Sequence, residues 1–286
     1  MIAQQYEAPS RWTVLADEVA KLPAFFRRDL LNALSYRFAF VTDWFGLLIQ
    51  AITISFVGVL VGHSADLPTY GGQPVTYTQF AIVGVALAGF TSLALVRVAA
   101  GIRNEQMLGT LESLLVTPTS TKTMQLGSVL YDLLFIPMRT ALFLLVTGIL
   151  FGLDFHASGI VPALIVLLAL LPFVWGIGVA TAGLVLTFRR GTVVLGFGTA
   201  ILTLLSGTVF PLSLLPHWLE VIARVNPLAI AIQSVRESLL GGAGIGEALI
   251  AVAELAPFSA VALVVGFWVF AVALRRERRH GTIGLY

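Results

Sequence analysis

Residues 160–188 read IVPALIVLLALLPFVWGIGVATAGLVLTF, and no charged side chain interrupts them. A helix rises about 1.5 Å per residue, so roughly 20 apolar residues cross the ~30 Å hydrocarbon core of a bilayer. An apolar run of this length is typical of a transmembrane helix. The stretch therefore predicts a chain that is embedded in a membrane.

The composition of the whole chain supports this interpretation. Of the 286 residues, 58% are hydrophobic and only 11% are charged, and the mean hydropathy is +0.94. Soluble domains carry about a quarter charged residues, so lipid must be the solvent for most of this surface. The sequence contains no cysteine, which excludes disulfides, Cys-ligated zinc, iron–sulfur clusters and a thiol nucleophile.

Five more stretches are long and apolar enough to span a bilayer, so we expect an all-α membrane protein with six transmembrane helices. The six predicted spans are residues 38–61, 77–99, 126–151, 160–188, 192–210 and 248–274. The fifth is the shortest. This divides the chain into a cytoplasmic N-terminal segment (1–37), a transmembrane domain (38–274) and a basic cytoplasmic tail (275–286).

The basic residues predict the orientation. Of the 17 Lys and Arg residues, 14 lie before the first span, in alternate connections and in the tail. Two lie in the connection between spans five and six, on the opposite side, and Arg139 falls within span three. Short cytoplasmic loops are enriched in Lys and Arg, so both termini are expected in the cytoplasm.

The segment before the first span has the pattern of a helix lying on the membrane surface. Trp12, Leu15, Val19 and Leu22 recur at helical spacing, opposite the charged residues Arg11, Asp17, Glu18 and Lys21. We expect a break at Pro23, after which apolar residues continue beside Arg27 and Arg28. This is typical of an interfacial helix on the anionic cytoplasmic leaflet. The alternative is a helix packed on a soluble partner.

Between spans five and six the sequence predicts two short helices at the outer surface. Pro211 and Pro216 interrupt the pattern after Phe210, and residues 217–225 are amphipathic, with Trp218 on the apolar face. Asn226 and Pro227 then supply an N-cap and a first-turn proline for a second helix. We expect the charged residues of this region at its wetter faces, namely Glu220, Arg224, Arg236 and Glu237.

Polar groups inside spans are costly and are therefore candidates for function. Asp132 and Arg139 lie seven residues apart on one face of span three. They could form a proton or ion relay, or an ion pair that only holds helices together, and both readings stay open. The four histidines have no metal-ligand spacing, so no metal site is expected, and no motif for a catalytic residue is present.

The chain also lacks the G-x-x-x-x-G-K-[ST] phosphate loop. It therefore cannot bind and hydrolyse a nucleotide by that route, and any ATP must be handled by another polypeptide. The basic residues lie beside the membrane and face lipid headgroups, so nucleic-acid binding is not expected. We expect no cofactor in this chain and no catalytic site of its own.

The cytoplasmic connection after span two carries the most specific motif. Residues 105–115 are predicted to form a short helix that ends at Thr117 and Pro118. Residues 105–118 match E-x-x-x-G-T-L-E-x-L-x-x-T-P at every position. This resembles the signature of the ABC-2 type permeases, the membrane subunits of bacterial exporters of drugs, lipids and polysaccharides. Residues 206–228 resemble the family again, in the stretch that it places between its fifth and sixth spans.

The resemblance implies the remaining expectations. The connection would be a coupling helix seated in a cleft of a separate ATPase subunit, through Glu105, Gly109, Thr110, Leu111, Glu112, Leu115, Thr117 and Pro118. Two ATPase subunits, which bind ATP and Mg²⁺, would serve two permeases, giving a homodimer in the bacterial inner membrane. The outer helices would close the exit, with Phe210, Pro211, Pro216, Trp218, Asn226 and Pro227 as gate residues.

An ion-coupled secondary transporter is the alternative function. Such proteins show internal repeats and several charges inside the membrane, and the sequence has neither. Co-purification of an ATPase would distinguish the two. The sequence does not define the transported substrate beyond a hydrophobic or amphipathic molecule.

Overall fold

The computed structural model describes residues 11–35, 37–61, 67–107, 120–187 and 191–280. Within these ranges the chain is helical and forms no strand beyond one isolated bridge between Tyr70 and Gln73. The α-helices are α1 (Arg11–Ser35), α2 (Arg37–Val61), α3 (Tyr77–Met107), α5 (Thr121–Phe151), α6 (Ile160–Thr187), α7 (Gly191–Leu204), α8 (His217–Arg224), α9 (Pro227–Gly241) and α10 (Ile245–His280). Two 3-10 turns, η1 (Ala157–Gly159) and η2 (Leu212–Leu214), complete the described elements.

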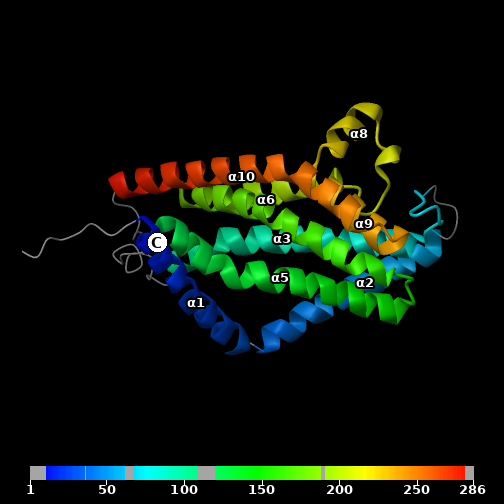
Figure 1. The fold of residues 1–286 in the computed structure, drawn as a ribbon, viewed down its shortest axis with the longest axis horizontal. Helices are drawn as coiled ribbons and strands as arrows, with labels where there is room; N and C mark the ends of the chain where they lie inside the picture. Colours follow the sequence, from blue (N-terminus) through cyan, green and yellow to red (C-terminus); the bar gives the residue numbers. More distant parts are fainter. Residues whose placement is uncertain (1–10, 36, 62–66, 108–119, 188–190, 281–286) are drawn as a thin grey trace, which may run out of the picture.

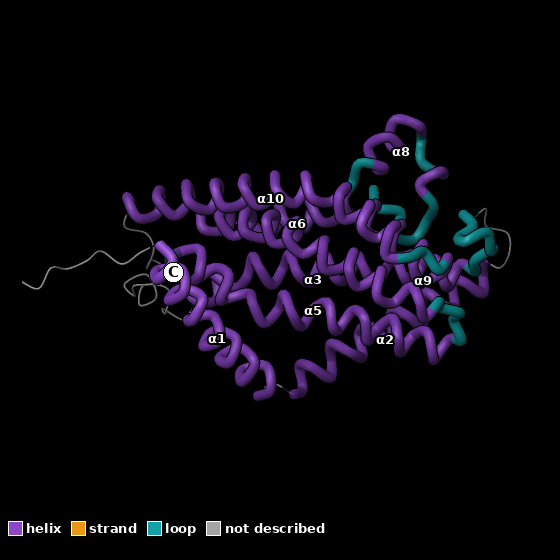
Figure 2. The backbone as a smooth tube through the Cα atoms, viewed as in Figure 1, coloured by secondary structure: helices purple, strands orange, loops and turns teal. Residues whose placement is uncertain are grey.

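Four long helices, α3, α5, α6 and α10, run side by side along the longest axis of the molecule (Figure 1). Helices α1 and α2 form a V on one flank, and α8 projects from the bundle near one end (Figure 1). The loops that the structure describes gather at the end where α8 and α9 lie (Figure 2). The all-α prediction is confirmed for the described part of the chain.

Four of the described helices are long and apolar enough to cross a bilayer. Their spanning parts are Tyr77–Arg97, Leu130–Phe151, Ala157–Val185 and Ile245–Arg276. The other two predicted spans fall on α2, in which Leu48–Val61 is the apolar part among the fully described residues, and on α7, which has 14 residues. At about 1.5 Å per residue α7 covers only about 21 Å. The structure therefore supports four spans, and a count of six stays a prediction.

Helices α6 and α10 form the closest pair in the bundle. Glycines make this approach possible: a Cβ on Gly176 would overlap the backbone at Ala262, and one on Gly266 would overlap the backbone of Gly176. Small residues that let backbones meet are typical of helix packing in membranes. Large apolar side chains instead point outward from α2, α5 and α10, among them Leu60, Ile149 and Val264. Lipid is the solvent that suits such a surface.

Segments that the charge pattern predicts on one side of the membrane lie at one end of the bundle. The start of α1, the end of α3, the start of α5 and the end of α10 share one end, which we call the inner end (Figure 1). Helices α8 and α9 lie at the opposite, outer end (Figure 1). Segments that we expected on the same side of the membrane thus lie at the same end of the molecule.

Two local predictions were wrong. Helix α1 continues through Pro23 instead of breaking there. A proline removes one hydrogen bond within a helix, and here the carbonyl that loses its partner belongs to Val19, an exposed residue, where water can replace the bond. In addition, the predicted short helix does not begin at Glu105, because α3 extends to Met107 and includes that residue; the rest of the predicted helix, 108–115, lies outside the described residues.

Candidate functional site

The connection that carries the signature lies mostly outside the described residues. Gly109, Thr110, Leu111, Glu112, Leu115, Thr117 and Pro118 fall in the range 108–119. Glu105 lies in the last turn of α3, where the structure describes the backbone only. What the structure shows is the frame around the connection: α3 ends at Met107 and α5 begins at Thr121, both at the inner end of the bundle.

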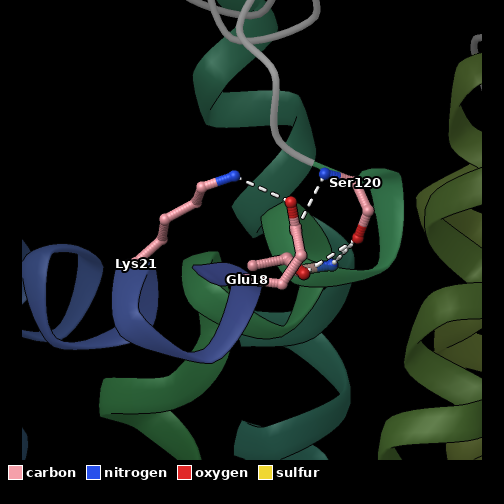
Figure 3. A network of polar contacts seen from close by, with 4 residues as sticks. Glu18, Lys21 and Ser120 are labelled. Carbon is pink, nitrogen blue, oxygen red and sulfur yellow. Dashed lines mark hydrogen bonds and ion pairs between the residues drawn. The ribbon is translucent and has the colours of Figure 1, made fainter. Parts of the chain in front are cut away.

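Helix α1 is fastened to the start of α5 by Glu18 (Figure 3). The Ser120 N–H donates to Glu18 Oε2 at 2.9 Å, and Lys21 Nζ donates to Glu18 Oε1 at 2.7 Å. Ser120 is also the N-cap of α5, because its Oγ accepts from the Thr123 N–H at 3.1 Å. Glu18 thus extends the cap of α5 from another helix, directly beside the signature connection.

The surroundings of Glu18 favour its charged form. The Lys21 ammonium, followed by hydrogen bonds from Thr123 and Ser120, lowers the pKa of Glu18 to about 2. A carboxylate near a helix N-terminus also interacts favourably with the helix dipole. Sequence reasoning placed Glu18 only on the polar face of the interfacial helix. The N-cap pattern Ser120-x-x-Thr123 marks the start of α5 in the sequence. It does not point to Glu18, which lies 102 residues before Ser120.

An aromatic contact continues this α1–α5 junction. The Phe25 ring covers Gly127, where a side chain would overlap it. The Phe26 and Tyr131 rings lie 6.0 Å apart, and Tyr131 stacks on Phe135 at 5.3 Å. This part of the apolar face of α1 therefore packs on α5. Arg27 and Arg28 are exposed, and Arg28 pairs with Asp29 at 2.8 Å; the side chain of Trp12 lies outside the described part.

At the outer end, α9 is a buried helix and not a surface one. Eleven of its 15 residues are buried, and it contacts α3, α6 and α10. Arg236, which we expected at a wet face, is only 2% exposed. That expectation was wrong because carbonyl groups, and not water, surround its guanidinium. Helix α8, in contrast, is largely exposed, with Trp218 at 65%.

Arg236 joins three separate segments. Its Nε and Nη2 donate to the Phe80 carbonyl in α3, at 3.1 and 2.9 Å, and Nη2 donates to the Thr208 carbonyl at 2.8 Å. The guanidinium carbon also lies 3.5 Å from the centre of the Phe80 ring. Arginine keeps its charge when buried and carries five donors in a fixed plane, which suits it to such a junction.

A row of hydrogen-bonded side chains, formed by Tyr70 and two residues of α9, lies next to Arg236. The Tyr70 hydroxyl donates to Gln233 Oε1 at 3.1 Å, and Gln233 Nε2 donates to Glu237 Oε1 at 3.2 Å. Tyr70 reaches α9 through a tight turn in which Gly71 has φ +58° and contacts the backbone of Gly241. The loop before α3 is thereby held against the end of α9.

Asn226 ties the end of α7 to the start of α9. Its Oδ1 accepts from the Leu228 N–H at 3.0 Å, as an N-cap does. Its Nδ2 donates to the carbonyls of Leu202 and Leu205 at 2.8 and 3.0 Å. Pro227 follows at the first helical position. The cap was predicted from the sequence, whereas the bonds to the carboxyl end of α7 were not.

The other expected gate residues lie on the path from α7 to α8. Pro211 is buried and precedes η2, and Pro216 immediately precedes α8. Phe210 is half-buried between them and the end of α7. The structure thus brings the predicted gate residues to the outer end, where Arg236 and Tyr70 join them.

Asp132 and Arg139 have different surroundings although they share a face of α5. The charged neighbours of Asp132 include Arg97 of α3 and Asp29 of α1. Arg139 lines a cleft of about 350 Å³ between α3 and α5, together with Gly89 and Phe90. For Asp132 and Arg139, a relay and a structural role both stay predictions. In the described ranges the acidic and histidine side chains form no group that could hold a metal ion.

Both junctions join separate segments of the chain. Glu18 fixes the helix beside the signature connection, and Arg236 with Asn226 fixes the outer helices. A family model described as ABC-2 type transporter matches residues 21–240, from within α1 almost to the end of α9. No curated protein matches the sequence.

Proposed function

The chain belongs to the ABC-2 type transporter family and is a multi-pass membrane permease, and from this we propose that it is the transmembrane subunit of an ATP-driven exporter. In this family the ATPase is a separate subunit, and the permease generally has no catalytic site. The proposed cargo is a hydrophobic or amphipathic molecule, such as a drug, a lipid or a lipid-linked glycan, that leaves the cytoplasm or the inner leaflet.

One observation carries the proposal: the region matched by the family includes the complete E-x-x-x-G-T-L-E-x-L-x-x-T-P motif at residues 105–118. This motif connects two long helices, α3 and α5, at the inner end. A chain without a phosphate loop must receive the energy of ATP through contact with another protein. A connection between two membrane-crossing helices is suited to pass that motion into the bundle.

In the proposed assembly, two copies of this chain bind two ATPase subunits, which hold ATP and Mg²⁺. The complex lies in the inner membrane of the cell, and both termini of this chain face the cytoplasm. Helices α2 and α7 complete a set of six spans. Residues 1–37 and 275–286 form the cytoplasmic segments on either side of the transmembrane domain.

ATP binding would close the ATPase pair and push on residues 105–118, with Glu105 and Glu112 facing basic residues of the ATPase. Helices α3 and α5 would move with that connection. By analogy with the family, α2, α3 and α7 would then separate or slide to open a path between the two permeases. Helix α8 and the segment before it would close the exit.

Exposed Arg27 and Arg28 on α1 would attract an anionic lipid or a phosphate-bearing substrate to the entrance. The basic cytoplasmic side explains the same residues without any substrate. Replacing both with alanine separates the two explanations, because only recruitment of an anionic substrate makes transport depend on them.

Affinity purification of the tagged chain from its native membrane tests the central proposal. We expect an ABC ATPase to co-purify with the wild-type chain and to be lost from the double variant Glu105→Ala, Glu112→Ala. Mass spectrometry identifies the partner, and ATP hydrolysis by the purified complex shows that it is active.

The matched control is the double variant Glu220→Ala, Glu254→Ala, which removes two carboxylates from α8 and from the outer part of α10. It should retain the ATPase. A wild-type preparation that contains no ATPase would contradict the proposal and favour the secondary transporter. Loss of the partner from the control as well would contradict the assignment of residues 105–118.

A further inference from the structure

A slot beside Gly84 of α3 accommodates the Arg236 guanidinium and the Thr208 carbonyl. The slot is open because residue 84 has no side chain. A Cβ on Gly84 would overlap the Thr208 carbonyl oxygen and crowd Arg236 Nη2. Gly84 lies one turn after Phe80 in α3, so the carbonyl of Phe80, the guanidinium and the carbonyl of Thr208 meet across this glycine. The segment before η2 can therefore approach α3 closely, and Arg236 fastens it there.

Helix α3 extends from the outer to the inner end of the bundle without a proline. Of the four described helices that qualify as spans, it alone contains no proline; α5 has Pro137, α6 has Pro172 and α10 has Pro257. Prolines are the commonest cause of kinks in helices. The 31 residues of α3 extend over about 46 Å. One end lies at the Arg236 junction and the other at residue 107, beside the signature connection.

The junction also reaches α8. Only Val225 and Asn226 separate α8 from α9, and Asn226 is held by its bonds to α7 and α9. Helix α8 is therefore joined to α9 by a short, hydrogen-bonded connection. Arg236 lies in the third turn of α9, where its bonds to the Phe80 carbonyl connect α9 to α3.

We propose that Arg236 is a positioning residue that transmits the movement of α3 to the outer helices α8 and α9. The inference rests on the proposed function, since the ATPase supplies the movement at the inner end. In this mechanism α3 delivers the motion and Arg236 converts it into displacement of the exit. Without the guanidinium, ATP would still be hydrolysed, but the outer helices would no longer respond.

The absence of cysteine from the sequence makes a site-specific test straightforward. Val221 on α8 is exposed, so Val221→Cys can carry a nitroxide or an environment-sensitive fluorophore in the purified complex with the ATPase. The measurement is the change in the label signal when ATP and Mg²⁺ are added. It is made in the otherwise wild-type chain, in Arg236→Gln and in Gly84→Ala.

Both variants should assemble with the ATPase and hydrolyse ATP, while the response of the label falls by about fivefold or more, the lower range of coupling between sites. Gly84→Ala retains the guanidinium and disturbs only the slot, so it carries the test if Arg236→Gln does not fold. Arg224→Gln removes an exposed cation from α8 and should leave the response intact.

A full response in either assembled variant would overturn the role of Arg236. So would a wild-type complex that hydrolyses ATP without any response at position 221, and in that case the exporter proposal would stand. Failure of the wild-type chain to bind any ATPase would instead overturn the exporter proposal, together with the inference that rests on it.

Discussion

Three side chains decide how segments far apart in the sequence meet: Glu18, Asn226 and Arg236. Each satisfies backbone groups of another element, and each does so where a helix begins or ends or where a loop turns. A buried backbone group without a partner costs about 1–3 kcal/mol. Substitutions of Asn226 or Arg236 that remove the donor should therefore destabilise the fold, because the carbonyl groups that they satisfy would lose their partners.

Asn226→Ala should lower the free energy of unfolding by about 2–3 kcal/mol, because it removes the cap of α9 and leaves two carbonyls at the end of α7 without their donor. Asn226→Asp retains the cap acceptor and loses the donors, so it separates the two contributions. The measurement is a denaturation titration in detergent. Ser213→Ala, an exposed position in η2, should change the value by less than about 0.5 kcal/mol.

Glu18 makes the α1–α5 junction sensitive to acid. Its folded pKa, about 2, lies below the ordinary value of 4.5, so the unfolded form binds the proton more readily and stability rises with pH. The contribution is complete above about pH 4.5 and disappears as the pH falls toward 2. Hydrogen exchange of the peptide that contains Ser120 should therefore show this pH dependence.

The same peptide should exchange several-fold faster in Glu18→Gln at neutral pH, and the dependence between pH 4.5 and 2 should vanish. Asp17→Asn removes the neighbouring, exposed carboxylate and serves as the control. Equal exchange in Glu18→Gln and the wild type would show that the junction does not depend on this carboxylate.

At the scale of elements, the close pairing of α6 and α10 depends on glycine. Gly176, Gly183 and Gly266 all lie where a side chain would overlap the backbone of the facing helix. Backbone contact replaces side-chain interdigitation here, and the pair gains dispersion contacts that larger residues would prevent. The longest helix, α10, is held in the bundle largely by this seam.

Gly266→Ala should destabilise the bundle by about 1–3 kcal/mol, the usual cost of overpacking. Gly246→Ala tests the seam specifically, because it lies on the same helix with open space around its Cβ position. That control should be neutral or slightly stabilising, since alanine favours the helix more than glycine does. Thermal unfolding in detergent measures both, and equal effects would contradict the role of close backbone contact.

At the scale of the whole molecule, the bundle has an inner and an outer end that differ in charge and in packing. The junction of α1 with α5 lies at the inner end, and the buried α9 closes the outer end (Figure 1). Helix α3 runs between these two ends and packs against α5, α6 and α9 on the way.

Cysteine labelling checks the predicted sidedness. Ser158→Cys in η1 and Ala20→Cys in α1 introduce single exposed thiols at opposite ends. In intact cells a membrane-impermeant maleimide should label position 158 and not position 20, and both should react after lysis. Labelling of position 20 in intact cells would contradict the orientation derived from the Lys and Arg distribution.

The sequence by itself determined the membrane environment, the helical class and the family motif, and it predicted the two sides. Hydrophobic length, the positions of Lys and Arg, and the cap at Asn226 and Pro227 are local properties, and a single chain segment displays each of them. The separation of the inner and outer ends in the structure agrees with them.

Only the tertiary structure decided how those segments are joined. Arg236 and Glu18 were both expected to face water, because a charged residue of an amphipathic helix usually does. Their partners include the Phe80 carbonyl in α3 and the Ser120 N–H just before α5, 156 and 102 residues away. Nothing in the local sequence records such a distant backbone group, and for that reason these junctions became visible only when the helices were packed.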